Sequence, residues 1–438
     1  MQTASKKVIN GWAMYDWANS VYNLVITTTI FPAYYVAITQ KGNERGDHFV
    51  SFFGRDYINT SLLDYVLAAV FLLVAISSPI LSSIADYRRN KKAYLRIFCI
   101  IGAAACCGLS LFTIERFELG VILFALAAIG YWASLVFYNS YLPDIAAPED
   151  QDRVSAKGFA MGYTGSILLQ IICFVIVMKP EWFAIPTENA WPVRLTFLLT
   201  GLWWFGFAQM TLRVLPDPPG KEQVGKNNIF TAGFKELNIV WKQVMQMPVL
   251  KRFLLSFFLY SMGVQTVLLV AAGFSKKEIF PNAEDEPKLL FTFILIQAVA
   301  IAGAVLMSRL SKLWGNIGVL MLSVVIWIAV CLWAYFVGSQ MEFYLLAATV
   351  GLVMGGIQSM SRSTYSKLLP ETRDTTSFFS FFDVTEKLAL VIGLFSFGFL
   401  EDLTHNIRYS ILTLVIFFVL ALIALLFTRS AARKHAIL

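Results

Sequence analysis

The stretch GWAMYDWANSVYNLVITTTIFPAYY, which runs from Gly11 to Tyr35, decides the fold of this chain. It is long enough to cross a membrane as a helix, yet it contains an acidic residue and several other polar residues. On a helix the spacing i, i+3, i+4 and i+7 puts four of them on one face, which Thr27 extends: Asp16, Asn19, Ser20 and Asn23. A carboxyl group facing lipid costs about 3 kcal/mol or more. We therefore predict that this face borders a water-filled cavity, which is the functional site.

Composition places the chain in a lipid environment. Of its 438 residues, 58% are hydrophobic and 14% are charged, whereas soluble domains are about half apolar and about a quarter charged. At roughly 20 residues per span there is room for about twelve helices, so we expect an all-α integral membrane protein whose partner is the lipid bilayer. The basic residues are scattered over loops, so nucleic acid is not an expected partner. The five cysteines lack the paired spacing of a metal site, and we expect no metal and no cofactor.

Hydrophobic segments predict twelve membrane-spanning helices in two groups of six. The predicted spans are Gly11–Ile38, Leu62–Ser83, Tyr94–Thr113, Leu119–Tyr141, Phe159–Met178, Val193–Val214, Phe253–Phe274, Leu289–Arg309, Ile317–Val337, Phe343–Met360, Phe378–Leu400 and Tyr409–Phe427. The longest polar segment, 215–247, contains PDPPG and is predicted to be a cytoplasmic linker with a short amphipathic helix near 229–244. We predict an N-terminal six-helix bundle over 1–214 and a C-terminal six-helix bundle over 248–438.

Lys and Arg placement predicts the orientation in the membrane. If the N-terminus is cytoplasmic, the cytoplasmic segments hold 24 of the 35 Lys and Arg residues and the opposite loops hold 10. This excess follows the positive-inside rule. Both termini are therefore expected in the cytoplasm.

The two groups of helices share short motifs. YNSYLPD, at 138–144, matches YSKLLPE, at 365–371, and each is followed by a polar loop and a Ser that opens the next span. The segment 82–86 matches 308–312 at nearly the same offset, about 226 residues. A common offset indicates a two-fold repeat of six helices, and transporters built from such repeats bind substrate between the halves near the bilayer midplane.

The basic hairpin after the second span, ADYRRNKKAY, resembles the loop between the second and third helices of the major facilitator superfamily. In that pattern a Gly precedes an Asp by four residues, and a second Gly and basic residues follow. Here Ser82 replaces the first Gly, Asp86 is present and Arg89 replaces the second Gly. The resemblance implies the major facilitator fold, in which two pseudo-symmetric six-helix bundles face each other.

The first span carries a more specific resemblance. YDWANSVYNLVITTTIFPAYY, at 15–35, is similar to the opening of the vacuole-effluxer family, the autophagy-related transporters of fungal vacuoles and their bacterial relatives. The stretch 142–165, which ends VSAKGFAMGYTG, resembles the same family's segment between the fourth and fifth helices. One departure concerns the seventh helix, where the family often has an acidic residue before a Gly. This chain reads FLYSMGVQT around Gly263, so no charge-dependent role is carried over to that position.

Three acidic residues are candidates for proton coupling. Asp16 is predicted to be desolvated, which suits reversible protonation, although a structural partner for it remains open. Asp383 and Lys387 are four residues apart at the start of the eleventh span and can pair on a helix. Glu386 then needs a partner or a proton. The alternative for this group is a structural charge cluster near the cytoplasmic face.

Polar residues in or near the spans are candidates for binding the solute or for controlling access to it. Those predicted to bind solute are Asn19, Ser20, Asn23, Tyr138, Asn139, Gln265, Thr266 and Gln358. Hydrogen bonds between helices are an equal alternative for Asn19, Ser20 and Asn23, and they are the more common role for residues such as Gln265, Thr266 and Gln358. Charged residues of the second-to-third and fourth-to-fifth connections are predicted to form a latch between helices that biases the conformational equilibrium, rather than a substrate site: Asp86, Arg88, Arg89, Asp144 and Arg153.

These observations predict a secondary active transporter, not an enzyme. We expect it to export a small polar solute such as an amino acid by alternating access, as a monomer of a bacterial inner (plasma) membrane, with a proton or another ion as coupling partner. An ATP-binding GxxxxGK[ST] loop does not occur in the sequence. An uncoupled facilitator or exchanger, an integral-membrane enzyme and a non-transporting receptor remain open. The scattered histidines argue against the enzyme, and the polar face of the first span argues against the receptor.

Overall fold

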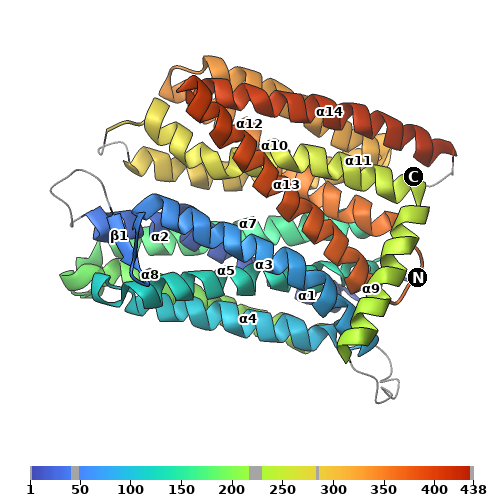
Figure 1. The fold of residues 1–438 in the computed structure, drawn as a ribbon, viewed down its shortest axis with the longest axis horizontal. Coiled ribbons are helices and arrows are strands. Elements are labelled where there is room, and N and C mark those ends of the chain that lie inside the picture. Colours follow the sequence, from blue (N-terminus) through green and yellow to red (C-terminus); the bar gives the residue numbers. More distant parts are fainter. Residues whose placement is uncertain (1, 41–48, 217–228, 283–285, 435–438) are drawn as a thin grey trace.

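The computed structural model of the chain describes residues 2–40, 49–216, 229–282 and 286–434. Its long helices run along the longest axis of the molecule (Figure 1). The first half of the chain forms α1 (Lys6–Val21), η1 (Tyr22–Thr29), α2 (Ile30–Thr39), α3 (Asn59–Tyr87), α4 (Lys91–Gly108), α5 (Phe117–Asn139), α6 (Leu142–Ile145), α7 (Gln151–Met178) and α8 (Trp191–Val214). The second half forms α9 (Ile229–Gln246), α10 (Pro248–Glu278), α11 (Glu286–Phe336), α12 (Gln340–Leu368), α13 (Thr375–Thr404) and α14 (Ile407–Lys434).

The predicted number of membrane spans is confirmed. Among the described residues, 10 helical segments are long and apolar enough to cross a membrane. One of them, 288–336 in α11, makes two spans because the chain turns at Gly315, where φ is 70° and ψ is 162°. An L side chain rarely adopts that positive φ, so the turn requires glycine. α13 adds a further helix of 30 residues, which packs against α3, α10 and α14. Together these are the twelve predicted spans.

Buried apolar side chains form two clusters, one for each half of the chain. The first half (α1 to α8) holds a cluster that extends from Ile9 to Leu215. The second half (α9 to α14) holds a cluster that extends from Val240 to Ala432, and α7 adds Tyr163 to it. In Figure 1 the two halves lie one above the other, and both termini lie at the same end. The predicted bundle boundaries at 214 and 248 stay a prediction.

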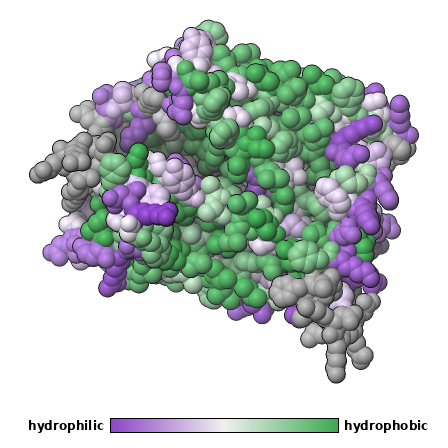
Figure 2. All heavy atoms as spheres, in the orientation of Figure 1, coloured by the Kyte–Doolittle hydropathy of each residue, from purple (hydrophilic) through white to green (hydrophobic). Residues whose placement is uncertain are grey.

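The molecular surface matches a protein surrounded by lipid. On the face drawn in Figure 2, hydrophobic side chains form a broad band across the middle, and hydrophilic side chains gather at the two ends. Large apolar side chains of the predicted spans are exposed, such as Leu72, Ile76 and Phe427. A soluble protein would rarely expose so continuous an apolar surface. The helices are therefore packed to face lipid on the outside and one another on the inside.

Two elements outside the spans shape the ends of the molecule. α9 confirms the predicted amphipathic helix: its Val240 and Val244 are buried, and it packs against α3, α10 and α13. It thereby connects the two halves at the end that carries the termini (Figure 1). At the opposite end, β1 (Phe49–Phe52) and β2 (Arg55–Ile58) form an antiparallel hairpin before α3, which the sequence analysis did not anticipate.

The first span is not one regular α-helix. Its middle, η1, is a π-helix of 8 residues between α1 and α2. The hydroxyl groups of Thr28 and Thr29 each donate a hydrogen bond to the carbonyl five residues earlier, at 2.8 and 2.7 Å. π-Helical turns are rare and often occur at functional sites. The wider turn changes which side chains share a face after Val21.

Two helices extend beyond their predicted ends. α12 begins with a capping box, in which Ser339 accepts a hydrogen bond from the Glu342 amide at 3.2 Å, and it continues to Leu368, just before Pro370. The predicted end at Met360 was therefore too early. α7 begins at Gln151 instead of Phe159. Because of these two errors, charged residues that belong to packed helices were predicted to lie in loops.

Candidate functional site

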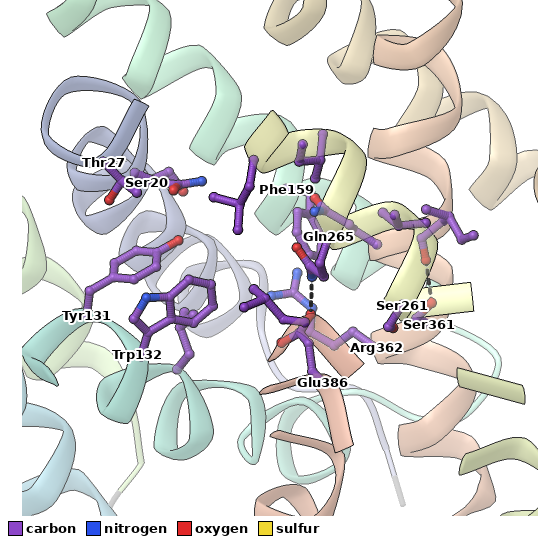
Figure 3. A pocket seen from close by; sticks show the side chains of 18 of the residues that line it. Ser20, Thr27, Tyr131, Trp132, Phe159, Ser261, Gln265, Ser361, Arg362 and Glu386 are labelled. Carbon is purple, nitrogen blue, oxygen red and sulfur yellow. Dashed lines mark hydrogen bonds between the residues drawn. The ribbon is translucent and has the colours of Figure 1, made fainter. Parts of the chain in front are cut away.

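A polar cavity of about 190 Å³ lies between the two halves of the molecule. It is lined from the first half by α1, η1, α3, α5 and α7, and from the second half by α10 to α13. Figure 3 shows Tyr131 and Trp132 of α5 on one side, Ser261 and Ser361 on the other, and Gln265 with Glu386 between them. The cavity that the first span predicted is present, and it has both polar and aromatic walls.

Asp16 lies at the cavity and forms an ion pair across the two halves. Its Oδ2 is 3.2 Å from Nη1 of Arg362, which belongs to α12. Asp16 is 5% exposed and Arg362 is 3% exposed. The hydroxyl of Tyr138 donates a second hydrogen bond to the same carboxylate oxygen, at 2.7 Å. A buried carboxylate is stable only when it is paired and hydrogen-bonded in this way.

Arg362 is held on every side by groups of the first half. Its Nε donates to the hydroxyl of Ser155 at 3.0 Å, its Nη2 donates to the Ser155 carbonyl at 2.8 Å, and its Nη1 also donates to Oδ1 of Asn139 at 3.2 Å. The guanidinium also lies 4.8 Å from the ring centre of Trp12 and 4.2 Å from that of Phe159. The flat guanidinium group suits both kinds of contact. One side chain of the second half thus joins α1, α5 and α7.

Close contact between α1 and α7 makes room for this pair. A Cβ on Gly158 would lie 2.5 Å from Oδ2 of Asp16 and 2.8 Å from Nη2 of Arg362. A Cβ on Gly162 would lie 2.6 Å from Oγ of Ser20. Small residues allow helices in membranes to approach closely. The glycines that the motif VSAKGFAMGYTG supplies therefore leave the space in which the ion pair sits.

Glu386 is the second carboxylate at the cavity, and it lies on α13. Nε2 of Gln265, on α10, donates a hydrogen bond of 2.7 Å to its Oε1 (Figure 3). Within the described residues it forms no ion pair. The predicted pairing of Asp383 with Lys387 is confirmed. Asp383 is buried away from the cavity lining, and the Lys387 ammonium lies 4.9 Å from the ring centre of Trp132 in the other half.

The structure separates the predicted solute-binding residues into two groups. Five of them line the cavity: Ser20, Asn23, Asn139, Gln265 and Gln358. Three others are fully buried and do not line it: Asn19, Tyr138 and Thr266. Asn19 accepts a hydrogen bond from Ser20 at 3.4 Å, while Tyr138 is held by Asp16. Contact with solute stays a prediction for the first group, and the geometry of the second group favours packing roles.

A second set of contacts joins the halves at the end of the molecule that carries the termini. Oδ2 of Asp86, at the end of α3, accepts hydrogen bonds from the amide and hydroxyl of Ser377, at 2.6 and 2.8 Å. Ser377 lies in the first turn of α13, where unpaired amides and the helix dipole favour a carboxylate. Lys91 of α4 donates to the hydroxyl of Thr375 at 3.0 Å and to Asp144. These bonds hold α3 and α4 of the first half against the start of α13.

The other side of the interface has a similar group, centred on Asp152 of α7. Its Oδ1 accepts from Nδ2 of Asn316 at 2.7 Å, and its Oδ2 accepts from the Ser311 hydroxyl and the Lys367 ammonium, each at 2.7 Å. In both groups the carboxylate belongs to the first half and its hydrogen-bond donors belong to the second half. Asp86 lies at the end of α3 and contacts the start of α13. Asp152 lies at the start of α7 and is contacted by the second half. Each half therefore binds the first turn of a helix that belongs to the other half.

The predicted latch residues have different positions. Asp86 accepts from Ser377, and Asp144 pairs with Lys91, as described above. Arg89 donates to the Arg373 carbonyl at 3.1 Å. Arg153 pairs with Asp150 within the first half, at 2.9 Å, so it does not join the halves. Arg88 is half-buried beside them. A role in conformational control stays a prediction for each of these residues.

Sequence reasoning missed the residues that complete the site. Arg362, Ser155 and Asp152 lie outside the predicted spans, because α12 continues beyond its apolar stretch and α7 begins before its own. For α12 the sequence does contain a signal. Pro370 is the first proline after the predicted end of the tenth span, so the helix can continue past Arg362 before a helix-breaking residue occurs. Among the described residues, no three His, Cys, Asp or Glu side chains gather as a metal site would require.

Comparisons with known proteins agree with this geometry. The family profile described as vacuole effluxer Atg22 like matches residues 4–436. A protein of Bacillus subtilis, named as the uncharacterized MFS-type transporter YxiO, is 29% identical over 419 residues, which covers 95% of this chain and 94% of the relative. Autophagy-related protein 22 of Yarrowia lipolytica is 26% identical over 477 residues, which covers 88% of this chain and 79% of the relative.

Solved structures share the fold at low sequence identity. The proton:xylose symporter XylE has a TM-score of 0.69 at 14% identity, with 95% of this chain and 94% of that chain covered. The Escherichia coli fucose:proton symporter FucP has a TM-score of 0.66 at 15% identity, with 96% and 97% covered. These likenesses show the major facilitator fold that the sequence predicted. Transport of small solutes, not enzymatic catalysis, is the activity of this group of proteins. The chain belongs to the vacuole effluxer Atg22-like family of major facilitator transporters.

Proposed function

We propose that this transporter moves a small polar solute, an amino acid or a similar metabolite, by alternating access through the cavity between its halves. The size of the cavity, about 190 Å³, fits a molecule of that class. Its walls combine amides and a carboxylate with aromatic rings, which would hold a solute that has both charged and apolar parts. The name vacuole effluxer, carried by the family, supports export of a solute from a membrane-bounded compartment.

The ion pair between Asp16 and Arg362 is the observation that carries the proposed mechanism. The pair spans the two halves and closes the cavity toward the end with the termini. A proton on Asp16 would remove the charge that holds Arg362, and it would weaken this closure. Release of the proton would restore the pair. Movement of a proton and movement of the halves are coupled in this way, and Glu386 and Asp383 are further candidates for carrying the charge.

Orientation and assembly complete the proposal. The excess of Lys and Arg at one end supports a cytoplasmic location for both termini in a bacterial inner membrane. The bundles 1–214 and 248–438 act as the two moving bodies, joined by the linker 215–247, and one chain contains the whole cavity. A monomer is therefore sufficient for transport.

Transport by purified protein in proteoliposomes tests the proposal. The solute is first found by a thermal-shift screen of amino acids, peptides, sugars and nucleosides, because a ligand raises the melting temperature according to its concentration over its Kd. An imposed pH gradient should then drive uptake by the wild type. Asp16→Asn should lose gradient-driven uptake and keep counterflow exchange, which also shows that the variant is folded. Full gradient-driven uptake by Asp16→Asn would reject coupling through this residue.

An uncoupled exchanger is a second candidate that one observation favours. Asp16 already has a cationic partner and a hydroxyl donor, so its charge is balanced without a proton. In that case wild-type uptake would follow the solute gradient alone and would not change when a protonophore is added. The same proteoliposomes distinguish the two mechanisms.

A further inference from the structure

A groove separate from the central cavity opens at the end of the molecule that carries the termini. It has a volume of about 250 Å³ and lies between the turn inside α11 and the last turns of α14. The α11 side supplies residues 314–318, and the α14 side supplies Arg429, Ala432 and Arg433. Nothing in the transport mechanism above uses this groove.

The groove is strongly basic. Arg429 and Arg433 are four residues apart on α14, so both guanidinium groups lie on the same face of the helix. Neither forms an ion pair in the part of the chain that the structure describes, and no carboxylate lines the groove. Two unpaired arginines that share one concave surface repel each other unless an anion binds between them. Guanidinium groups bind phosphate oxygens through paired hydrogen bonds.

The rim of the groove is apolar and exposed. Leu313 is 77% exposed and Trp314 is 54% exposed, although both are large hydrophobic residues. They lie at the turn between the two membrane spans of α11, and such a turn is expected at the membrane–water interface. Tryptophan is enriched at this level of membranes because its ring is apolar and its N–H is polar. The rim is therefore suited to the region of lipid headgroups and upper acyl chains.

Two glycines keep the groove open. Gly315 has the positive φ that turns the chain, and a Cβ placed on it would meet no atom within 4 Å. Gly318 also lines the groove, and a Cβ there would contact only Cβ of Trp314, at 3.3 Å. The side chain of Asn316 turns toward Asp152 and Thr364 instead, at 2.7 and 3.2 Å. The space beside Gly315 and Gly318 is therefore not filled by side chains of the turn, and Arg429 and Arg433 face it from α14.

We propose that this groove binds a phosphate-bearing anion between Arg429 and Arg433, with Trp314 covering the apolar part of the ligand. The chemistry fits the headgroup of an anionic phospholipid and also a soluble phosphate ester. Asn316 connects the groove to the Asp152 group that holds the halves together. A bound anion would hold the turn at Gly315 in place and would thereby stabilise the hydrogen bonds between Asp152 and the second half.

The test is a thermal-shift titration of the full-length protein in a neutral detergent. Dioctanoyl phosphatidylglycerol is the lipid probe, glycerol 3-phosphate is the soluble probe, and dioctanoyl phosphatidylcholine is the zwitterionic control. Loss of a hydrogen bond to a charged group is worth about 1.5–3 kcal/mol, so Arg429→Gln and Arg433→Gln should each weaken the apparent affinity about tenfold or more. Gly318→Leu should weaken it by filling the groove with both arginines intact.

Arg213→Gln is the matched control, because Arg213 is an exposed arginine in the last turn of α8, at the same end of the other half. It removes the same charge and should leave the affinity unchanged. A shift with phosphatidylglycerol alone that the groove variants lose identifies a lipid ligand. An equal shift with glycerol 3-phosphate that they lose identifies a soluble ester. Shifts that are absent, or that are equal in wild type, Gly318→Leu and both arginine variants, overturn the proposal.

Discussion

Asp16 and Arg362 are 346 residues apart in the chain, and their side chains meet at 3.2 Å in the interface between the halves. Each is polar in a region of buried apolar side chains, and each belongs to a helix of a different half. A contact of this kind exists only while the halves are together at this end. The pair therefore reports on the conformation of the whole molecule.

The first prediction concerns the stability of this pair. Asp16→Asn leaves the buried guanidinium of Arg362 without its counterion, which should destabilise the protein by about 3–5 kcal/mol. Replacing both residues, as Asp16→Asn with Arg362→Met, removes the uncompensated charge and should recover most of the loss. Apparent melting temperatures of the two single variants and the double variant measure this coupling. Additive losses in the double variant would show that the two side chains do not interact.

A second prediction tests the space that the pair requires. Gly158→Ala places a methyl group 2.5 Å from the Asp16 carboxylate and should separate α1 from α7. Overpacking of this kind destabilises a core by about 1–3 kcal/mol, so the melting temperature should fall. Gly206→Ala in α8 is the control, since no atom lies within 4 Å of its added Cβ. Equal melting temperatures for the two variants would contradict the proposed packing.

Sequence patterns predicted the fold well because membrane solvation acts on every residue. Apolar stretches of about 20 residues must span the bilayer as helices, so the number of spans followed from the sequence. Asp16 was found for the same reason, since a carboxyl group in such a stretch needs a polar partner. The identity of that partner did not follow. Arg362 lies in a polar run, SMSRSTYSK, that resembles a loop in composition and becomes buried only when the halves meet.

Helix geometry explains why the predicted polar face was only partly correct. Positions 16, 20 and 23 line the cavity, as an α-helical face requires, but Asn19 is buried beside it. The π-helix then brings Thr28 to the cavity together with Thr27. A π-helix depends on the packing of neighbouring helices, and the sequence does not mark it. Local spacing therefore predicts most of the face, and tertiary packing decides that Asn19 is excluded from the cavity and Thr28 is added to it.

A third prediction tests whether an amide that lines the cavity contributes to solute binding. Asn23→Ala removes an amide that faces the cavity, so the thermal shift caused by a bound solute should need about tenfold more solute. Gln209→Ala removes a half-buried amide of α8 that donates to the Phe205 carbonyl and does not line the cavity, and this variant should bind solute like the wild type. The check is a titration of melting temperature against solute for both variants. Unchanged solute affinity in Asn23→Ala would remove Asn23 from the binding site.

The fourth prediction tests whether the halves must part at the end that carries the termini. The hydroxyl oxygens of Ser83 in α3 and Ser377 in α13 are 3.4 Å apart, so cysteines at both positions should form a disulfide under mild oxidation. The crosslink would hold the cavity closed at this end, and transport in proteoliposomes should stop. Each single-cysteine variant should transport under the same oxidation, and reduction should restore the double variant. The five native cysteines are replaced beforehand, so that only the new pair can react.

Alternating access predicts this reversible block because solute can leave only when Ser83 and Ser377 separate. A crosslinked protein that transports at the full wild-type rate would show that solute passes without this separation.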